Sequence, residues 1–206
     1  MATRAQGTTA TDPAPEAPRG RHTAALLALL ASGLLGLVAS LVLAVDAVAL
    51  AEDPLADLSC NISSTISCAT VGVSWQASLL GFPNAFLGLM GEPVVITIAV
   101  AALAGVRFPR WFMLAAQAGI TVGLGFAVWL FVQSYFVIGA ICPWCTALYV
   151  TSVAAFAAIT RITILDGLYG PAIRTRCERP LRLGVDVAGA VIVLAIVAAM
   201  VVYKYL

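Results

Sequence analysis

Five cysteines are the residues of this chain best suited to chemistry, and four of them fall into two pairs. Cys142 and Cys145 enclose a Pro-Trp dipeptide, and seven residues separate Cys60 from Cys68. Cysteines that meet in pairs can be joined and separated by thiol–disulfide exchange, a reaction that moves two electrons. Cys177 has no partner in this pattern and is interpreted as a spare thiol. The two pairs therefore predict redox chemistry.

The Cys-Pro-Trp-Cys motif is expected to open a helix, because Pro143 is favoured at the first helical position. Both sulfurs would then lie in the first turn, where unpaired backbone donors and the helix dipole stabilise a thiolate. This position favours redox exchange over the alternatives, which are a structural disulfide, zinc ligands or haem attachment. The spacing of Cys60 and Cys68 is too long for a zinc knuckle, and Thr146 stands where haem attachment requires His. No metal is expected.

The other pair lies on a polar loop, whose side chains include Asn61, Ser63, Ser64, Thr65 and Ser67. Such a loop is expected to be flexible. A disulfide between Cys60 and Cys68 could then meet a soluble protein and afterwards reach the second pair. Taken alone, the loop pair would more often be a structural staple, but its coupling to a redox-type pair favours a shuttle.

The composition places these cysteines in a membrane protein. Hydrophobic residues make up 62% of the 206 residues and charged residues only 10%. A helix needs about 20 mainly apolar residues to cross roughly 30 Å of hydrocarbon. We therefore expect an all-α integral membrane protein with five transmembrane helices, near Thr23–Val48, Asn84–Ala104, Trp111–Ile138, Cys142–Thr160 and Leu183–Tyr203.

Basic residues fall on one side of this topology. Ten arginines precede the first span or lie in the second-to-third and fourth-to-fifth connections, whereas Lys204 ends the last span. Since basic residues beside spans are retained in the cytoplasm, the amino terminus is expected there. The chain would lie in the inner (plasma) membrane with the loop 51–81, both cysteine pairs and the carboxyl terminus outside.

Two domains are expected from this topology. Residues 1–22 have little to bury and are predicted to be a disordered cytoplasmic tail, and residues 23–206 the transmembrane catalytic domain. The net charge of +1 gives no indication of nucleic acid as a partner, because topology alone explains the arginines.

Polar residues near the cysteines suggest where the electrons go. Tyr149 lies four residues after Cys145 on the same expected helix face, and Asn84 begins the second span at a similar depth. A phenol and a carboxamide can hydrogen-bond the oxygens of a quinone, the obvious two-electron acceptor in a bilayer. Alternatively, Tyr149 belongs to the interfacial aromatic belt and Asn84 caps a helix.

Two carboxyl groups leave alternatives open. Glu92, about 12 Å into the second span, either supplies protons to a reduced quinone or forms a structural hydrogen bond between helices. Asp46, near the end of the first span, either fixes the loop that contains Cys60 or is simply solvated.

Several segments together carry a family resemblance. Residues 60–68, the Val-Gly-Val-Ser-Trp-Gln-Ala sequence at 71–77 and the Gly-Phe-Pro-Asn-Ala-Phe-Leu-Gly sequence at 81–88 resemble the bacterial vitamin K epoxide reductase family. So does the Cys-Pro-Trp-Cys motif at 142–145, with Tyr149 beyond it. The resemblance covers nearly all of the chain after residue 21.

The resemblance implies a four-helix bundle around a quinone, with the fifth span outside it and a short amphipathic helix over Val71–Leu80 capping the pocket. It implies that Cys142 and Cys145 are the active-site pair and Cys60 and Cys68 the shuttle pair. The quinone contacts would be Asn84, Tyr149, Val71 and Phe86.

The resemblance also implies a partner and a direction. Electrons would pass from a thioredoxin-like (DsbA-like) protein outside the membrane, through the shuttle pair and the active-site pair, to the membrane quinone pool. Many bacterial members carry a fused thioredoxin-like domain after the fifth span, whereas this chain ends at Leu206, so a separate partner is expected. Menaquinone is favoured over ubiquinone, since an Arg-rich and Ala-rich composition with one Lys is typical of a high-GC bacterium. A reductase of quinones or epoxides, or a transporter with structural disulfides, are the rival interpretations.

Overall fold

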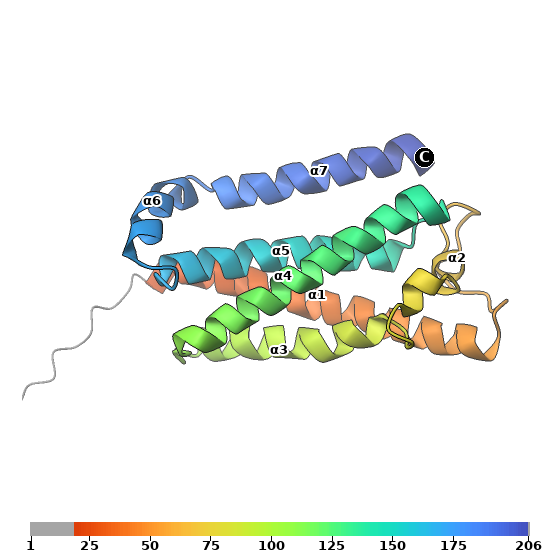
Figure 1. Cartoon of the computed structure of the whole chain (residues 1–206), viewed down its shortest axis with the longest axis horizontal. Coiled ribbons are helices and arrows are strands. Elements are labelled where there is room, and N and C mark those ends of the chain that lie inside the picture. The colour runs from red at the N-terminus through yellow and green to blue at the C-terminus, as the bar shows by residue number, and fades with distance from the viewer. Residues whose placement is uncertain (1–18, 206) are drawn as a thin grey trace, which may run out of the picture.

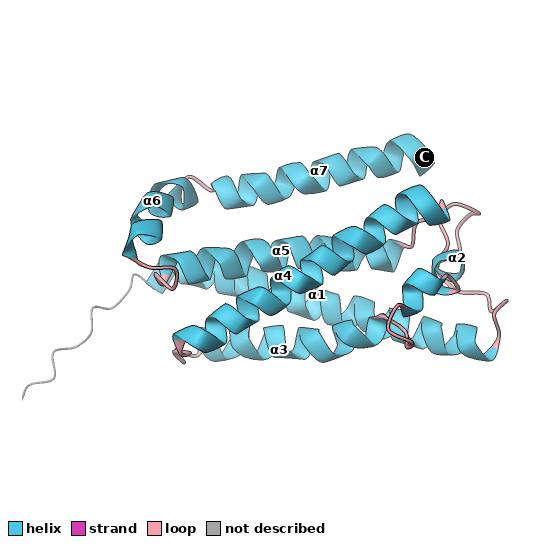
Figure 2. Cartoon of the chain, in the orientation of Figure 1, coloured by secondary structure: helices cyan, strands magenta, loops and turns pink. Residues whose placement is uncertain are grey.

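The computed structural model describes residues 19–205, so most of the expected tail, residues 1–18, lies outside the described residues. Within residues 19–205 the regular structure is helical, apart from one isolated bridge between two residues (Figures 1 and 2). The helices are α1 (Arg19–Glu52), α2 (Cys68–Gly72), the 3₁₀ helix η1 (Trp75–Ser78), α3 (Ala85–Leu103), α4 (Arg110–Val132), the π-helix η2 (Gln133–Ile138), α5 (Pro143–Leu165), α6 (Pro171–Arg182) and α7 (Val185–Tyr205).

Five of these helices are long and apolar enough to cross a membrane. They are α1, α3, α4 with its continuation η2, α5 and α7. The prediction of an all-α fold with five transmembrane helices is confirmed. The shortest of the five candidate spans has 19 residues, which at 1.5 Å per residue covers about 30 Å.

Four of the long helices form a bundle and the fifth lies beside it. α1 packs along α3 and α5, α4 packs along α5, and α7 runs along one side of α5 (Figure 1). An ion pair of 2.9 Å between Arg161 and Asp186 ties α7 to α5. At the other end of α7, Lys204 donates a hydrogen bond to the backbone oxygen of Tyr135 in η2.

The two ends of the bundle differ in content. We call the end with the connections 104–109 and 166–184 the arginine end, and the end with 53–84 and 139–145 the cysteine end. The largest buried cluster packs α1, α3, α4 and α5 near the arginine end and includes Leu29, Ile98, Met113 and Ile159. The largest part of the hydrophobic core therefore lies away from the cysteines.

Small residues bring α1 and α3 together. A Cβ at Gly88 would overlap the side chain of Ser40, and a Cβ at Gly36 would come within 2.5 Å of Glu92 Oε1. Glycines at helix contacts permit such close backbone approach in membranes. At Gly36, the glycine also leaves the space that the Glu92 carboxyl group occupies.

Two features differ from the sequence-based expectations. The single amphipathic helix expected over Val71–Leu80 is wrong, because the chain forms α2 and η1 with a break between them. Ser74 Oγ donates to the backbone oxygen of Val71 at 2.6 Å, and this local bond competes with continuing the helix. The Arg-rich amphipathic helix α6, at the arginine end, was not expected.

Candidate active site

A short backbone pairing brings the two cysteine pairs together. Ile66 and Ile141 form a parallel bridge, in which Ser67 N–H donates to Ile141 O at 3.0 Å and Ile141 N–H donates to Thr65 O at 2.8 Å. Each bridged isoleucine lies one or two residues before a cysteine. The bridge therefore fixes the approach of Cys68 to Cys142.

The four cysteines at this end form one continuous group of sulfurs. Cys60 and Cys68 are joined in a disulfide with a Cα–Cα distance of 5.7 Å, and Cys142 and Cys145 are free thiols. Cys142 Sγ lies 3.3 Å from Cys68 Sγ. A thiolate at Cys142 is thus already beside a disulfide sulfur that it can attack, as exchange requires. Because the loop sulfurs are bonded to each other, they offer no pair of thiolates to a metal in this state.

Cys142 is the N-cap of α5 and Pro143 is the first helical residue, as the motif predicted. Cys142 Sγ accepts a hydrogen bond from Cys145 N–H at 3.3 Å. Hydrogen bonding from the Cys145 thiol, supported by the backbone N–H groups of Cys145 and Trp144, lowers the pKa of the Cys142 thiol even though burial opposes it. Cys142 is therefore a better leaving group than an ordinary cysteine and is more readily ionised to the nucleophilic thiolate.

The Cys68 end of the loop is anchored in this structure rather than loose. Asn61 Oδ1 accepts hydrogen bonds from Ser67 Oγ at 2.9 Å and from Ala69 N–H at 3.1 Å. Ser67 caps α2, since its Oγ accepts from Thr70 N–H at 3.1 Å. The expected flexible polar loop thus uses its polar side chains to hold Cys68 in place.

Asp46 reaches the same group of sulfurs from α1. Its Oδ2 lies 3.6 Å from Cys60 Sγ. Of the two alternatives left open by the sequence, the contact with the Cys60 loop is the one found. Since Cys60 is only 6% exposed, this carboxyl group faces a sulfur that water hardly reaches.

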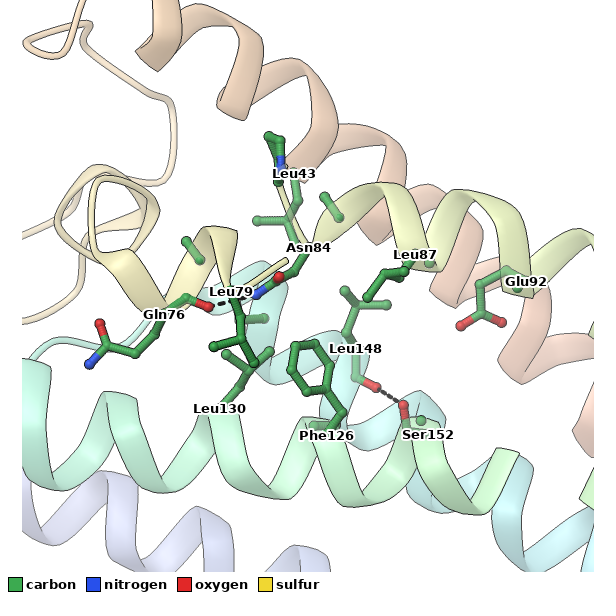
Figure 3. Close-up of a pocket in the computed structure, with 18 of the residues that line it drawn as sticks. Leu43, Gln76, Leu79, Asn84, Leu87, Glu92, Phe126, Leu130, Leu148 and Ser152 are labelled. Carbon is green, nitrogen blue, oxygen red and sulfur yellow. Dashed lines mark hydrogen bonds between the residues drawn. The ribbon is translucent and has the colours of Figure 1, made fainter. Parts of the chain in front are cut away.

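A cavity of about 1400 Å³ extends from the sulfurs into the bundle. α1, α3, α4, α5 and the α2–η1 segment enclose it, and Cys68, Cys142 and Cys145 lie in its wall. Figure 3 shows Leu87, Phe126 and Leu130 around it, with the Phe126 ring directed inward. Large, mostly apolar cavities with few polar groups are typical of small-molecule sites.

Asn84 supplies a polar group in this apolar wall. Its Nδ2 donates to the backbone oxygen of Gln76 at 2.6 Å (Figure 3), whereas its Oδ1 is buried and has no partner among the described residues. An unpaired buried oxygen is costly unless a ligand pairs with it. Asn84 precedes α3 without making a side-chain cap bond, so the alternative of a side-chain helix cap is not found.

Comparison with known families agrees with this arrangement. A model described as the vitamin K epoxide reductase family matches residues 27–160, which include both cysteine pairs and most of the cavity wall. The chain belongs to the vitamin K epoxide reductase family. It is accordingly a multi-pass membrane protein of a family of quinone-linked thiol oxidoreductases. A search of curated proteins finds no match to the chain.

Two residues to which the vitamin K epoxide reductase resemblance assigns quinone contacts lie outside the large cavity. Contrary to the expected shared face with Cys145, Tyr149 is absent from the cavity wall and packs against Phe131, with ring centroids 5.5 Å apart, and against Val197 of α7. Phe86 lines a small separate pocket against α1. Val71 does line the large cavity.

Two further polar residues bear on the site. Glu92 lies in the cavity wall with its carboxyl group directed into the cavity (Figure 3) and with no hydrogen bond to the rest of residues 19–205. Gln76, which sequence reasoning missed, is 3% exposed and supplies the backbone oxygen that orients Asn84. The only signal for it was a single glutamine beside Trp75, in a segment with no other large polar side chain.

Proposed function

We propose that this protein oxidises a thioredoxin-like protein outside the cytoplasm and passes the electrons to a membrane quinone, which supports disulfide formation. The observation that carries the proposal is the 3.3 Å separation of Cys68 Sγ and Cys142 Sγ. This contact places the loop disulfide beside a pair of thiols that line an apolar cavity. Electrons can follow that path through two thiol exchanges.

The cavity suits a quinone with a prenyl chain. Its apolar wall fits the ring and chain, and the unpaired Asn84 Oδ1 can accept a hydrogen bond from a quinol hydroxyl group. The lining continues along α3 to Ile98 and along α4 to Trp111, and Figure 1 shows α4 leaning away from α3 toward the cysteine end. A bound quinone supplies the two-electron acceptor; menaquinone is the proposed species and ubiquinone the second.

The first thiol exchange occurs at the shuttle pair. A thiolate of the thioredoxin-like protein attacks Cys60 Sγ and Cys68 leaves as a thiolate. The second thiol of the partner, once deprotonated, then attacks the mixed disulfide, so the partner departs oxidised. Cys60 and Cys68 are left reduced by two electrons. Because the attack occurs at Cys60, the Cys68 thiolate is released beside Cys142, which it attacks in the second exchange.

The second exchange moves the electrons inward. When Cys142 and Cys145 are joined, Cys68 attacks Cys142 Sγ and Cys145 leaves as a thiolate facing the cavity. Cys60 then attacks Cys68, the Cys68–Cys142 bond breaks, and Cys142 leaves as a thiolate stabilised by its hydrogen bonds. This restores the Cys60–Cys68 disulfide. Two electrons and two protons leave the inner thiols when they form their disulfide again.

The arginines support the proposed orientation. Seven arginines between residues 104 and 184 lie in the loops or helix ends at the arginine end: Arg107, Arg110, Arg161, Arg174, Arg176, Arg179 and Arg182. By the positive-inside rule this end faces the cytoplasm, and the cysteine end faces the space where disulfides persist. The protein would therefore lie in the inner (plasma) membrane with its carboxyl terminus outside.

Bleaching of an added quinone tests the function. Purified protein is mixed with a soluble menaquinone analogue and a reduced thioredoxin-fold protein, and quinone absorbance is followed. We expect turnover in the wild type and in Cys177→Ser, and none in Cys142→Ser or Cys145→Ser. Cys60→Ser and Cys68→Ser should lose oxidation of the protein while a small dithiol still reduces the quinone through the inner pair. Absence of quinone bleaching in the wild type would refute the proposal.

A further inference from the structure

Asp46 is placed where a proton must move during the exchange. The step that restores the Cys60–Cys68 disulfide needs Cys60 as a thiolate, because a thiol is a poor nucleophile. Cys60 is buried in a cluster with Leu50, Leu58 and Val71, and such surroundings oppose ionisation of a thiol. Some group must therefore remove its proton.

The Asp46 carboxylate is the described group that can do so. Its Oδ2 lies 3.6 Å from Cys60 Sγ, which is within the range of a hydrogen bond to sulfur. Asp46 is half-buried on α1, and no basic side chain of residues 19–205 pairs with it. A carboxylate without a cation beside it is free to accept a proton.

Among the titratable groups around Asp46 within residues 19–205, no other is placed to remove the Cys60 proton. From the loop and α2 it meets Cys60 and Cys68, and from the start of α5 the Cys142 and Cys145 thiols lie within electrostatic range. Glu92 on α3 contacts α1 at Gly36, ten residues or about 15 Å along the helix from Asp46. Glu92 is therefore too far away to reach Cys60.

We propose that Asp46 is the general base for the shuttle pair: it accepts the Cys60 proton as Cys60 attacks Cys68 and displaces Cys142. This rests on the proposed function. In that step the S–S bond forms between Cys60 and Cys68, the Cys68–Cys142 bond breaks, and the electron pair leaves on Cys142. The proton passes from Cys60 to the Asp46 carboxylate. When the partner later leaves Cys60 as a thiolate, the protonated Asp46 returns the proton to Cys60.

A single turnover measures this step directly. Fully reduced full-length protein is mixed with a soluble menaquinone analogue, quenched with acid at intervals, alkylated and digested. Mass spectrometry then follows the Cys68–Cys142 bond and its conversion to the Cys60–Cys68 bond. Asp46→Asn should slow that conversion by roughly 100-fold at about pH 6, the order expected for loss of a general base. The Cys68–Cys142 species should accumulate.

The pH profile separates a base from a structural contact. In Asp46→Asn the conversion rate should rise about tenfold per pH unit and should still rise above the ordinary thiol pKa of about 8.5, because only ionised Cys60 attacks and burial opposes its ionisation. The wild-type rate should rise far less steeply. Asp46→Glu, which keeps a carboxylate, should recover part of the rate. Asp57→Asn removes an exposed carboxylate three residues from Cys60 and should match the wild type.

Equal rates and equal pH slopes in Asp46→Asn and the wild type would overturn the role of Asp46. Diamide in place of the quinone forms the inner disulfide chemically, so this comparison does not depend on quinone activity. A wild type that responds to diamide but not to quinone would refute the proposed function and leave the Asp46 result standing. If Asp46→Asn does not fold, the pH slope of the wild type decides: a wild-type conversion rate that rises about tenfold per pH unit would show that no base assists Cys60 and would overturn the inference.

Discussion

Cys68 on α2 and Cys142 at the start of α5 hold their sulfur atoms 3.3 Å apart, across 74 residues of sequence. Cys60 is bonded to Cys68 on the far side and Cys145 follows Cys142 in the first turn of α5. Only one sulfur of each pair thus contacts the other pair. This contact predicts the order of exchange.

The contact predicts which mixed disulfide can be trapped. In a Cys145→Ala protein the return attack on Cys142 is impossible, so a Cys68–Cys142 bond should accumulate during oxidation. Alkylation, digestion and mass spectrometry would identify it. A Cys60–Cys142 bond would reverse the roles of the loop cysteines, and no bond between the pairs would contradict the relay.

Asn84 is predicted to bind the quinone. Asn84→Ala removes the orphaned Oδ1, and loss of one hydrogen bond of about 0.5–1.5 kcal/mol should lower kcat/KM for a soluble quinone about two- to tenfold. Thr97→Val is the matched control, since this exposed residue of α3 does not line the cavity. Kinetics equal to those of the control would remove Asn84 from the site.

The same assay tests Tyr149. Its contact with the quinone stays a prediction. A several-fold rise in the quinone KM of Tyr149→Phe would place its hydroxyl group on the ligand. Unchanged kinetics would leave Tyr149 to its packing against Phe131.

The lowered pKa of Cys142 predicts more thiolate at neutral pH than an ordinary cysteine has. In the fully reduced protein, ultraviolet thiolate absorbance that is lost in Cys142→Ser should titrate with a midpoint below the ordinary value of about 8.5. Thiolate and its reactivity are then retained as pH falls and disappear only below the lowered pKa. Cys145→Ala deletes the thiol hydrogen bond and should raise the midpoint. A midpoint at or above the ordinary value in the wild type would show that burial dominates.

The orientation is tested by labelling in intact cells. After reduction, a membrane-impermeant maleimide should label Cys60 or Cys68, and it should spare Cys177 on α6 at the arginine end. Permeabilised cells provide the control, because Cys177 should then react. Labelling of Cys177 in sealed cells would invert the topology and move the thiol chemistry to the cytoplasm.

The long helices could be predicted because the bilayer imposes one requirement, a sustained apolar run. The start of α5 was equally predictable, since Pro143 and the Cys-x-x-Cys spacing both act locally. The contact between Cys68 and Cys142 is not fixed by any local pattern in the sequence. It depends on the bridge between Ile66 and Ile141, and neither isoleucine carries a pairing signal.

Tyr149 shows why helix spacing alone places a side chain poorly. Residues four apart are offset by about 40° around a helix. That offset is enough for Cys145 to face the cavity while Tyr149 packs against Phe131 of α4 and Val197 of α7. Which flank of α5 is covered depends on where other helices pack, and periodicity within α5 contains no such information.

The hollow cysteine end has a consequence for the life of the protein in the cell. Packed side chains fill part of the bundle near the arginine end, whereas a mostly apolar cavity of about 1400 Å³ runs from the cysteines along α3 and α4. A quinone that fills this space stabilises the folded state in proportion to its concentration over its dissociation constant. Cells starved of quinone should therefore lose the protein itself to degradation, and restoring the quinone should restore its abundance before any new synthesis of partners. The quinone would then contribute to the packing of the protein as well as accept electrons, and the supply of quinone would set the lifetime of the protein.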